Sequence, residues 1–427
     1  MIELGIRSSG AIVLSSLLRV VWLLAFGMFF IVSCKKGAPT DSSALPKADP
    51  GPNQSTSVGC YVVLDGSHSM RGTGDTIKYN WSADPSNPNY VYFESGAPRP
   101  QIGFLVAGTY KFNLVVNDGI QTSEPAEVDV IVGPHIASAF EDPHLELYVR
   151  LALQVPLGTL TDSALGQLDS LFVVPANPKM YSLKGIEKCS HLAIAQFSGE
   201  SIGDITPLAS LTSLTWLDID QSWAFKDISS LSSLVNLKHL NLYGNYVSDI
   251  SAVAGLKTLQ YLNIAENSGI QDISVVANLF QLQELDIENS HLNSIVPISQ
   301  LTQLKTLYLA TCGISDITPL ANLRNLQLLE LDLNQVADIS PLINLTGLQV
   351  IYIMNNQITD ISVLQNLPDL KVLHLMQNRI TDLKPLVANP AFANGCFAGL
   401  EGNPLDSTSI YVYIPALKMR GVTVGWP

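Results

Sequence analysis

Three consecutive stretches decide the fold: LTQLKTLYLATCGISDITPLAN (301–322), LRNLQLLELDLNQVADISPLIN (323–344) and LTGLQVIYIMNNQITDISVLQN (345–366). Each is 22 residues long and follows the pattern LxxLxxLxLxxNxIxDIxxLxx with small departures. A fixed period of about 20–50 residues is typical of a solenoid, in which each repeat forms one turn. One turn cannot bury its own leucines, so neighbouring turns must stack and both ends must be capped.

The same pattern runs through residues 182–389, and a degenerate further unit ends in LEGN (400–403). The LxL part of each unit predicts a short strand, whose leucines point into the solenoid while the residues between and beside them point out. The Asn eleven places after the first Leu can turn its amide inward and pair with backbone groups of the adjacent turn. This place holds Asn245, Asn267, Asn334, Asn356 and Asn378, and in three other units Ser222, Ser290 and Cys312.

The second half of each unit, xDIxPL, predicts the convex return, with Ile in the core and Pro capping an irregular or 3-10 turn. These repeats resemble the internalin-type branch of bacterial leucine-rich repeat proteins. The resemblance extends upstream to residues 134–181, where Leu145, Val149 and Leu153 share one helix face, as expected of a helical N-terminal cap. Downstream, GNPLDSTSIYVYIPALKMRGVTV (402–424) resembles the family's C-terminal cap, which we place at residues 390–427.

Residues 57–133 read differently, as short alternating runs separated by Gly, Asn and Asp, which indicates antiparallel strands. In KFNLVVNDG, the side chains of Phe112, Leu114 and Val116 face one side, and Trp81 is the expected core anchor. ADPGPNQSTSVG (48–59), LDGSHS (64–69) and the Gly108-x-Tyr110-x-Phe112 run are similar to polycystic-kidney-disease (PKD) domains. That resemblance implies an immunoglobulin-like β-sandwich acting as a spacer.

The first 33 residues predict a secretory signal, because basic residues precede an apolar run from Val20 to Val32. Ile31-Val32-Ser33-Cys34 resembles the bacterial lipobox, which implies cleavage before Cys34 and attachment of a lipid to its thiol. The alternative is an uncleaved signal anchor, since the 23 residues from Gly10 to Val32 are long enough to span a bilayer. Residues 34–56 have almost nothing to bury and predict a flexible tether.

Stacked strands make a concave face, and the places that flank the two leucines of LxL point toward it. Aromatic residues gather there among acidic ones, which is typical of binding surfaces, although cross-strand aromatic pairs also stabilise sheets. The candidate ligand-binding residues are Trp216, Asp218, His239, Tyr243, Tyr261, Asp286, Tyr308, Glu330, Tyr352 and His374. Glu284, Asp286 and Glu288 together suggest calcium, but a solvated acidic surface is the favoured interpretation.

Composition and missing motifs argue against several classes of function. The chain has 37 acidic and 23 basic residues, a net charge of −14, so it lacks the basic excess that nucleic-acid binding requires. HExxH, GxSxG and phosphate-binding glycine loops are missing, so we predict no catalytic residue, metal site or cofactor. Cys60, Cys189, Cys312 and Cys396 fall in different modules, and four buried free thiols are expected.

We therefore expect a mainly β protein, a leucine-rich repeat solenoid preceded by an immunoglobulin-like sandwich. The expected function is that of a bacterial envelope lipoprotein, at the outer membrane or cell surface, which holds a protein or glycan ligand on its concave face. The alternative is a structural envelope scaffold without a discrete ligand. We expect a monomer that is not an enzyme and whose membrane contact is the lipid anchor.

Overall fold

The computed structural model describes residues 45–136 and 138–426, so the signal segment and Cys34 lie outside the described residues. Two compact units are present. Residues 45–54, 63–102 and 108–131 form the first, and residues 55–62, 103–107 and 132–426 form the second. Within the described ranges, no helix has the length and apolar character needed to cross a bilayer.

The N-terminal β domain, most of which belongs to the first unit, contains a four-stranded sheet. Its strand order is β1 (Gln54–Ser57), β6 (Ala126–Gly133), β5 (Gly108–Asn117) and β3 (Lys78–Ala83). A two-stranded sheet pairs β2 (Tyr61–Val63) with β4 (Gln101–Gly103). Alternate side chains of β5 form the core. Phe112, Leu114 and Val116 are completely buried, as predicted, and Trp81 is 2% exposed opposite Leu114. The Trp81 indole Nε1 donates to the carbonyl of Ala97 at 3.0 Å, which satisfies its one polar atom.

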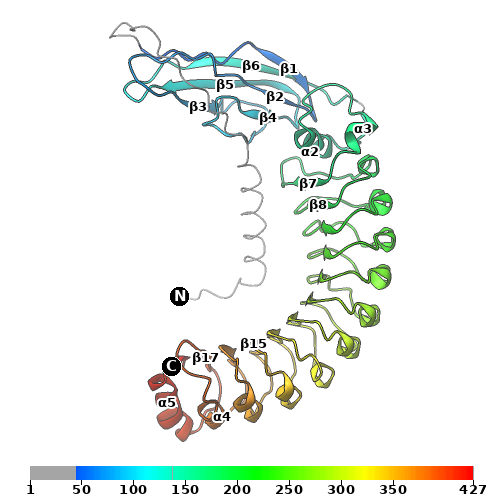
Figure 1. Ribbon diagram of the computed structural model, residues 1–427, viewed down its shortest axis with the longest axis vertical. Helices are drawn as coiled ribbons and strands as arrows, with labels where there is room; N and C mark the ends of the chain where they lie inside the picture. Colours follow the sequence, from blue (N-terminus) through cyan, green and yellow to red (C-terminus); the bar gives the residue numbers. More distant parts are fainter. Residues whose placement is uncertain (1–44, 137, 427) are drawn as a thin grey trace. The chain divides into compact units, whose positions relative to one another are not determined.

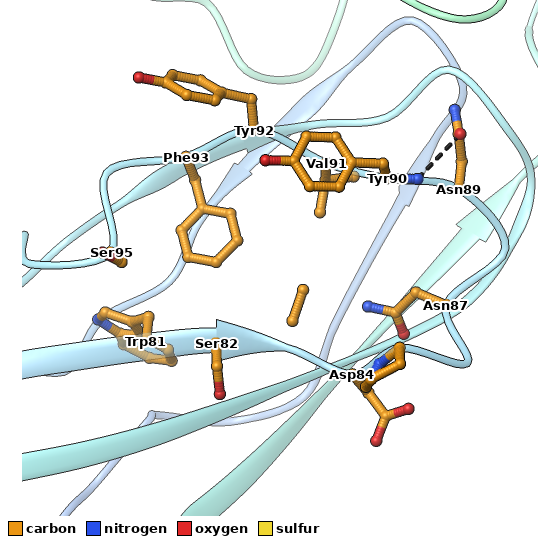
Figure 2. Close-up of a pocket in the computed structure, with 12 residues that line it drawn as sticks. Trp81, Ser82, Asp84, Asn87, Asn89, Tyr90, Val91, Tyr92, Phe93 and Ser95 are labelled. Atoms are coloured by element: carbon orange, nitrogen blue, oxygen red, sulfur yellow. Dashed lines mark hydrogen bonds between the residues drawn. The ribbon is translucent and has the colours of Figure 1, made fainter.

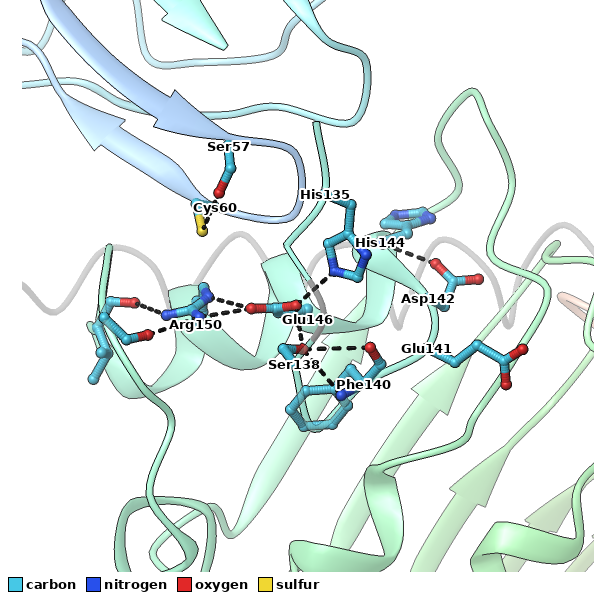
Figure 3. Close-up of polar contacts among 12 residues, drawn as sticks. Ser57, Cys60, His135, Ser138, Phe140, Glu141, Asp142, His144, Glu146 and Arg150 are labelled. Carbon is cyan, nitrogen blue, oxygen red and sulfur yellow. Dashed lines mark hydrogen bonds and ion pairs between the residues drawn. The ribbon is translucent and has the colours of Figure 1, made fainter. Parts of the chain in front are cut away.

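A helical segment precedes the solenoid, with α2 (Pro143–Leu153) and α3 (Asp162–Leu165). Asp142 caps α2 by accepting from the His144 amide at 2.8 Å. Figure 3 shows the Glu146 carboxylate between Arg150, an ion pair of 2.6 Å, and His135, whose Nε2 lies 2.8 Å away. Leu145 and Val149 are fully buried and Leu153 is half-buried against the same core, so the apolar face of α2 covers the first strand as expected.

The predicted solenoid is confirmed as a 12-stranded parallel sheet whose strand order follows the chain. Its strands are β7 (Ser170–Val173), β8 (Ile194–Phe197), β9 (Trp216–Asp218), β10 (His239–Asn241), β11 (Tyr261–Asn263), β12 (Glu284–Asp286), β13 (Thr306–Tyr308), β14 (Leu328–Glu330), β15 (Val350–Tyr352), β16 (Val372–His374), β17 (Phe397–Gly399) and β18 (Thr423–Gly425). Figure 1 shows these strands on the inner side of the solenoid's arc and the 3-10 turns on the outer side.

Nine 3-10 turns form the convex side of the described solenoid: η1 (Ile186–Lys188), η2 (Thr206–Ser210), η3 (Ser229–Ser233), η4 (Ser251–Gly255), η5 (Ser274–Asn278), η6 (Val296–Gln300), η7 (Thr318–Leu320), η8 (Ser340–Asn344) and η9 (Ser362–Asn366). Helix α4 (Lys384–Ala388), a π-helical turn η10 (Ser409–Tyr413) and helix α5 (Ile414–Met419) follow. The sheet begins at β7, upstream of residue 182, where the sequence predicted the repeats to start. The sequence did not reveal this first strand because SLFV lacks the Asn that makes later units readable.

Leucines of the LxL strands form continuous buried ladders. Leu285, Leu307 and Leu329 pair in register across β12–β14, and all three are fully buried. Burying one leucine side chain contributes roughly 2 kcal/mol. Stacking therefore supplies the stability that no single turn has alone.

The buried asparagines bind backbone groups of neighbouring turns, as predicted. Asn334 Nδ2 donates to the carbonyls of Leu309 and Leu331 at 2.8 and 3.0 Å, and Oδ1 accepts from the Cys312 and Ile314 amides at 3.1 and 2.9 Å. In the same place of another turn, the thiol of Cys312 donates to the carbonyl of Ile287 at 3.2 Å.

The serines at this place behave differently. Ser222 and Ser290 are buried, yet their Oγ atoms have no hydrogen-bond partner among the described residues. A hydroxyl on Cβ reaches less far than an amide on Cγ, so these two side chains do not reproduce the asparagine contacts. The four cysteines, Cys60, Cys189, Cys312 and Cys396, are free and buried, which confirms that prediction.

The recurring aspartates of the convex side are structural. Each accepts at Oδ1 from the backbone amide two residues later, at 2.7–2.9 Å, and so caps the turn that follows. Hydrogen bonds from Ser229 and Ser251 lower the pKa of Asp227 and Asp249. The series comprises Asp204, Asp227, Asp249, Asp272, Asp316, Asp338, Asp360 and Asp382.

Replacing Asn334 by Ala should reduce the free energy of unfolding by roughly 2–3 kcal/mol, because buried backbone groups of two turns lose their partner. Asn366→Ala, an exposed position at the end of η9, is the matched control and should change stability by less than about 0.5 kcal/mol. Urea unfolding followed by circular dichroism measures both. Equal effects of the two changes would contradict a stabilising role of the buried amide.

Candidate functional site

The structure places all ten predicted ligand-binding residues along one face of the parallel sheet, in consecutive units from β9 to β16. Nine lie within the strands, and Tyr243 closely follows β10. The register makes them neighbours: Asp286 lies opposite Tyr308, Tyr308 opposite Glu330, and so on to His374. Most are half-buried, so the face is a surface of packed side chains and not a row of extended ones.

The N-terminal part of this face carries a stack of three rings. Trp216 and His239 lie 3.5 Å apart between ring centroids at an interplanar angle of 4°, and His239 and Tyr261 lie 4.0 Å apart at 6°. Both flat faces of the His239 ring and one face each of Trp216 and Tyr261 are therefore occupied within the stack. The stack stabilises the sheet, as cross-strand aromatic pairs do, and it also fixes the side chains in one arrangement.

Asp218 holds this aromatic stack in place from the end of β9. Its Oδ2 accepts from Trp216 Nε1 at 2.9 Å, and its Oδ1 lies 2.9 Å from His239 Nε2. The Asp218 residue is only 6% exposed. Its carboxylate is thus engaged with two neighbouring side chains.

A second group of rings occupies the C-terminal part. Tyr352 and His374 have centroids 4.8 Å apart, and His374 lies 5.0 Å from Phe397, which the sequence analysis did not select. Phe397 begins β17, in the degenerate unit. The Asn403 at the end of that unit sets the register and would have placed Phe397 on the same face.

Between the two aromatic groups lie the carboxylates of β12 and β14 and of the residues that follow these strands. Asp286, Glu288 and Asp332 are 8%, 6% and 6% exposed. The prediction of a solvated acidic surface is therefore wrong at Asp286 and Glu288. In the described residues no group of three or more His, Cys, Asp and Glu side chains is arranged to hold a metal ion.

Burial has a clear electrostatic consequence in this region. It raises the pKa of Asp286, Glu288 and Asp332 to about 7, and the charges of neighbouring carboxylates add to the effect. The pKa of Glu330 rises to about 8 for the same reasons. The pKa of the Tyr308 phenol is raised as well, first by burial and then by four surrounding carboxylates.

An exposed aromatic pair beside the face was not among the residues selected from the sequence. Trp223 and Tyr246 are 48% and 60% exposed, and their ring centroids lie 6.2 Å apart. The sequence feature that could have revealed this pair is the one extra residue in the unit that starts at Leu211, which allows a bulge of the chain at Trp223.

The β domain has a hollow of its own, of about 500 Å³, between β3 and the segment 89–95. Figure 2 shows Val91 and Phe93 pointing toward β3 and Tyr92 pointing away. Tyr90 and Tyr92 are 85% and 86% exposed. The alternation in Tyr90-Val91-Tyr92-Phe93 was a readable signal for this arrangement, which the sequence analysis did not use.

The raised pKa values predict an unusual dependence of stability on pH. Carboxyls whose pKa is higher in the folded than in the unfolded chain stabilise the fold at acid pH, and this contribution is lost as pH rises through about 7–8. The free energy of unfolding should therefore fall between pH 5 and 8.5. Glu330→Gln should reduce this fall, whereas Asp369→Asn, at an exposed position, should not. Identical pH profiles for wild type and Glu330→Gln, measured by urea unfolding, would refute the assignment.

Two known protein families match separate parts of the chain. The family model described as leucine rich repeats (2 copies) matches residues 235–278, 281–322, 324–366 and 346–388. A second family model, which describes a PKD domain, matches residues 50–132. No curated protein matches the chain.

Solved structures of two internalins from Listeria monocytogenes resemble the chain. InlF is 27% identical, with 66% of this chain and 94% of InlF covered and a TM-score of 0.53. Internalin C2 is 26% identical, with 63% and 95% covered and a TM-score of 0.37. The chain thus carries leucine-rich repeats that resemble those of the Listeria internalins, after an N-terminal PKD-like domain.

Proposed function

We propose that this protein is a cell-envelope lipoprotein that binds a protein ligand on the concave face of its solenoid, with the PKD-like domain as a spacer. The observation that carries the proposal is the unbroken register of aromatic and acidic side chains from β9 to β16. Similarity of the repeats to those of an internalin supports a binding role and not an enzymatic one.

The size of the face favours a protein over a small ligand. Eight strands at about 4.8 Å spacing span roughly 34 Å, which is the scale of a standard protein interface and far longer than a single sugar. A long glycan chain would also fit this length. Tyr, Trp and His side chains held by stacking lose little conformational freedom on binding, which favours their use as contact residues.

The alternative function, an envelope scaffold without a discrete ligand, draws support from the Trp216–His239–Tyr261 stack, because those rings already satisfy one another. A scaffold would be expected to self-associate or to bind peptidoglycan. It would also be indifferent to changes on the concave face.

The first test is capture of partners from host and envelope extracts by the purified full chain. Joint replacement of Trp216, Tyr243, Tyr308 and Tyr352 by Ala should weaken capture at least about 100-fold, since each anchor of an interface contributes roughly 1–2 kcal/mol or more. Binding of the isolated partner, measured by surface plasmon resonance, gives the magnitude.

The matched control replaces Phe280 and Tyr411 by Ala. Both side chains are exposed, at 56% and 77%, and both lie outside the strands of the concave face. Capture should be unchanged in this control. Capture that survives the fourfold concave change, with the circular dichroism spectrum intact, would exclude the concave face and favour the scaffold.

Anchoring at Cys34 is part of the same proposal. Cys34→Ala should abolish incorporation of a radiolabelled fatty acid and release the protein from the membrane fraction, whereas Cys60→Ala, a buried cysteine, should do neither. A Cys34→Ala protein that stays in the membrane fraction would instead indicate an uncleaved signal anchor. Protease treatment of intact cells then distinguishes surface from periplasmic exposure.

A further inference from the structure

Four carboxylates lie together in the middle of the concave face, and we refer to them as the carboxylate cluster: Asp286, Glu288, Glu330 and Asp332. Asp286 and Glu330 flank Tyr308 in directly paired positions of β12, β13 and β14. Glu288 and Asp332 follow these strands, and the hydrogen bonds from Asn289 N to Ala310 O and from Thr311 N to Asp332 O continue the register. In this register Ala310 is the residue between Glu288 and Asp332.

No basic side chain of the described residues forms an ion pair with this cluster. The nearby lysines are engaged elsewhere. Lys305 Nζ donates to Gln283 Oε1 at 2.8 Å and Lys371 Nζ to Gln349 Oε1 at 3.3 Å. The contrast with Asp218, which is paired with His239, sets the cluster apart from the rest of the face.

Glu288 supplies a second and separate observation. Glu288 is only 6% exposed, and its Oε1 atom is buried with no hydrogen-bond partner among the described residues. The Glu288 carboxylate also lies near Glu330, and its charge raises the pKa of the Glu330 carboxyl. A buried acceptor without a donor is costly, and a donor supplied by a ligand would satisfy it.

We propose that the carboxylate cluster, together with the Tyr308 ring, binds the ammonium or guanidinium group of a Lys or Arg side chain of the ligand. A cation finds several carboxylate oxygens and an aromatic ring within one small area, and both kinds of group attract it. This inference rests on the proposed function and specifies the chemistry of the partner, a protein with a basic surface.

The raised pKa values of the cluster make this binding depend on pH in a range where ordinary surface carboxylates do not titrate. Near pH 6 the cluster holds protons, since pKa values of about 7 and 8 lie above that pH. Near pH 8.5 it is ionised and open to a cation. The titratable groups beside it on the neighbouring strands and turns are Tyr261, Glu266, Glu284, Tyr308, Cys312 and Tyr352. None of these groups is basic.

The test uses the full chain and a defined probe, acetylated and amidated pentalysine, with the corresponding pentaglutamine as the neutral control. Titration calorimetry at low salt should give binding of pentalysine at pH 8.5 that is about tenfold or more tighter than at pH 6, because two ionisations separate these states. Lysine itself stays charged throughout this range.

The double variant Glu288→Gln/Glu330→Gln should lose at least about tenfold in affinity at pH 8.5 and should lose the pH dependence. The control Glu124→Gln/Asp369→Asn removes the same charge at two exposed positions and should keep both. Wild-type binding that is equal at the two pH values, or a double variant that binds like wild type, would overturn the inference.

Failure of the cation site can be distinguished from failure of the proposed ligand-binding function. Partner capture that depends on Trp216, Tyr243, Tyr308 and Tyr352, without pentalysine binding, would refute the cation site alone. Pentalysine binding without any capture of a partner would leave the cation site in place and refute the proposed ligand-binding role.

Discussion

The structure depends on a buried asparagine amide that, at most turns of the solenoid, binds the backbone of the neighbouring turns. A parallel strand of three residues leaves its carbonyl and amide groups unsatisfied where it bends away, and a leucine core cannot satisfy them. Asn334 binds two carbonyls and two amides from adjacent turns, and Asn356 and Asn378 repeat part of that pattern. The amides thus fix the rise and register with which the leucine ladders stack, and the leucines then supply the free energy.

This fixed register also creates the candidate site. Because one turn repeats every 22 residues, a given place of the repeat forms a continuous column across the sheet. Aromatic rings at adjacent positions of such a column can lie parallel and stack, as those of Trp216 and His239 do. Carboxylates in such a column become neighbours regardless of their mutual repulsion, as Asp286 and Glu330 do on either side of Tyr308. The geometry of the core therefore sets the electrostatics of the face.

Periodicity made the repeats, the inward leucines, the asparagine contacts and the outward columns readable from sequence, because each follows from a pattern of fixed spacing. The pattern could not predict the burial of Asp286 and Glu288, since it records which way a side chain points but not how closely the neighbouring side chains pack around it. It also missed features that depart from the period, such as Trp223 after an inserted residue and Phe397 in a degenerate unit. Tyr90 and Tyr92 lie in the β domain, where no repeat supplies a frame of comparison.

The parallel arrangement of all twelve strands has a further consequence for recognition. An antiparallel or twofold-symmetric surface can look alike from both ends, but this face cannot. It runs from the Trp216–His239–Tyr261 stack, through carboxylates without an ion-pair partner, to the Tyr352–His374–Phe397 group. The face therefore has a direction, and an elongated partner laid along it with its ends reversed would present its basic groups to the wrong neighbours. Polarity of docking is thus built into the solenoid by the order of its turns.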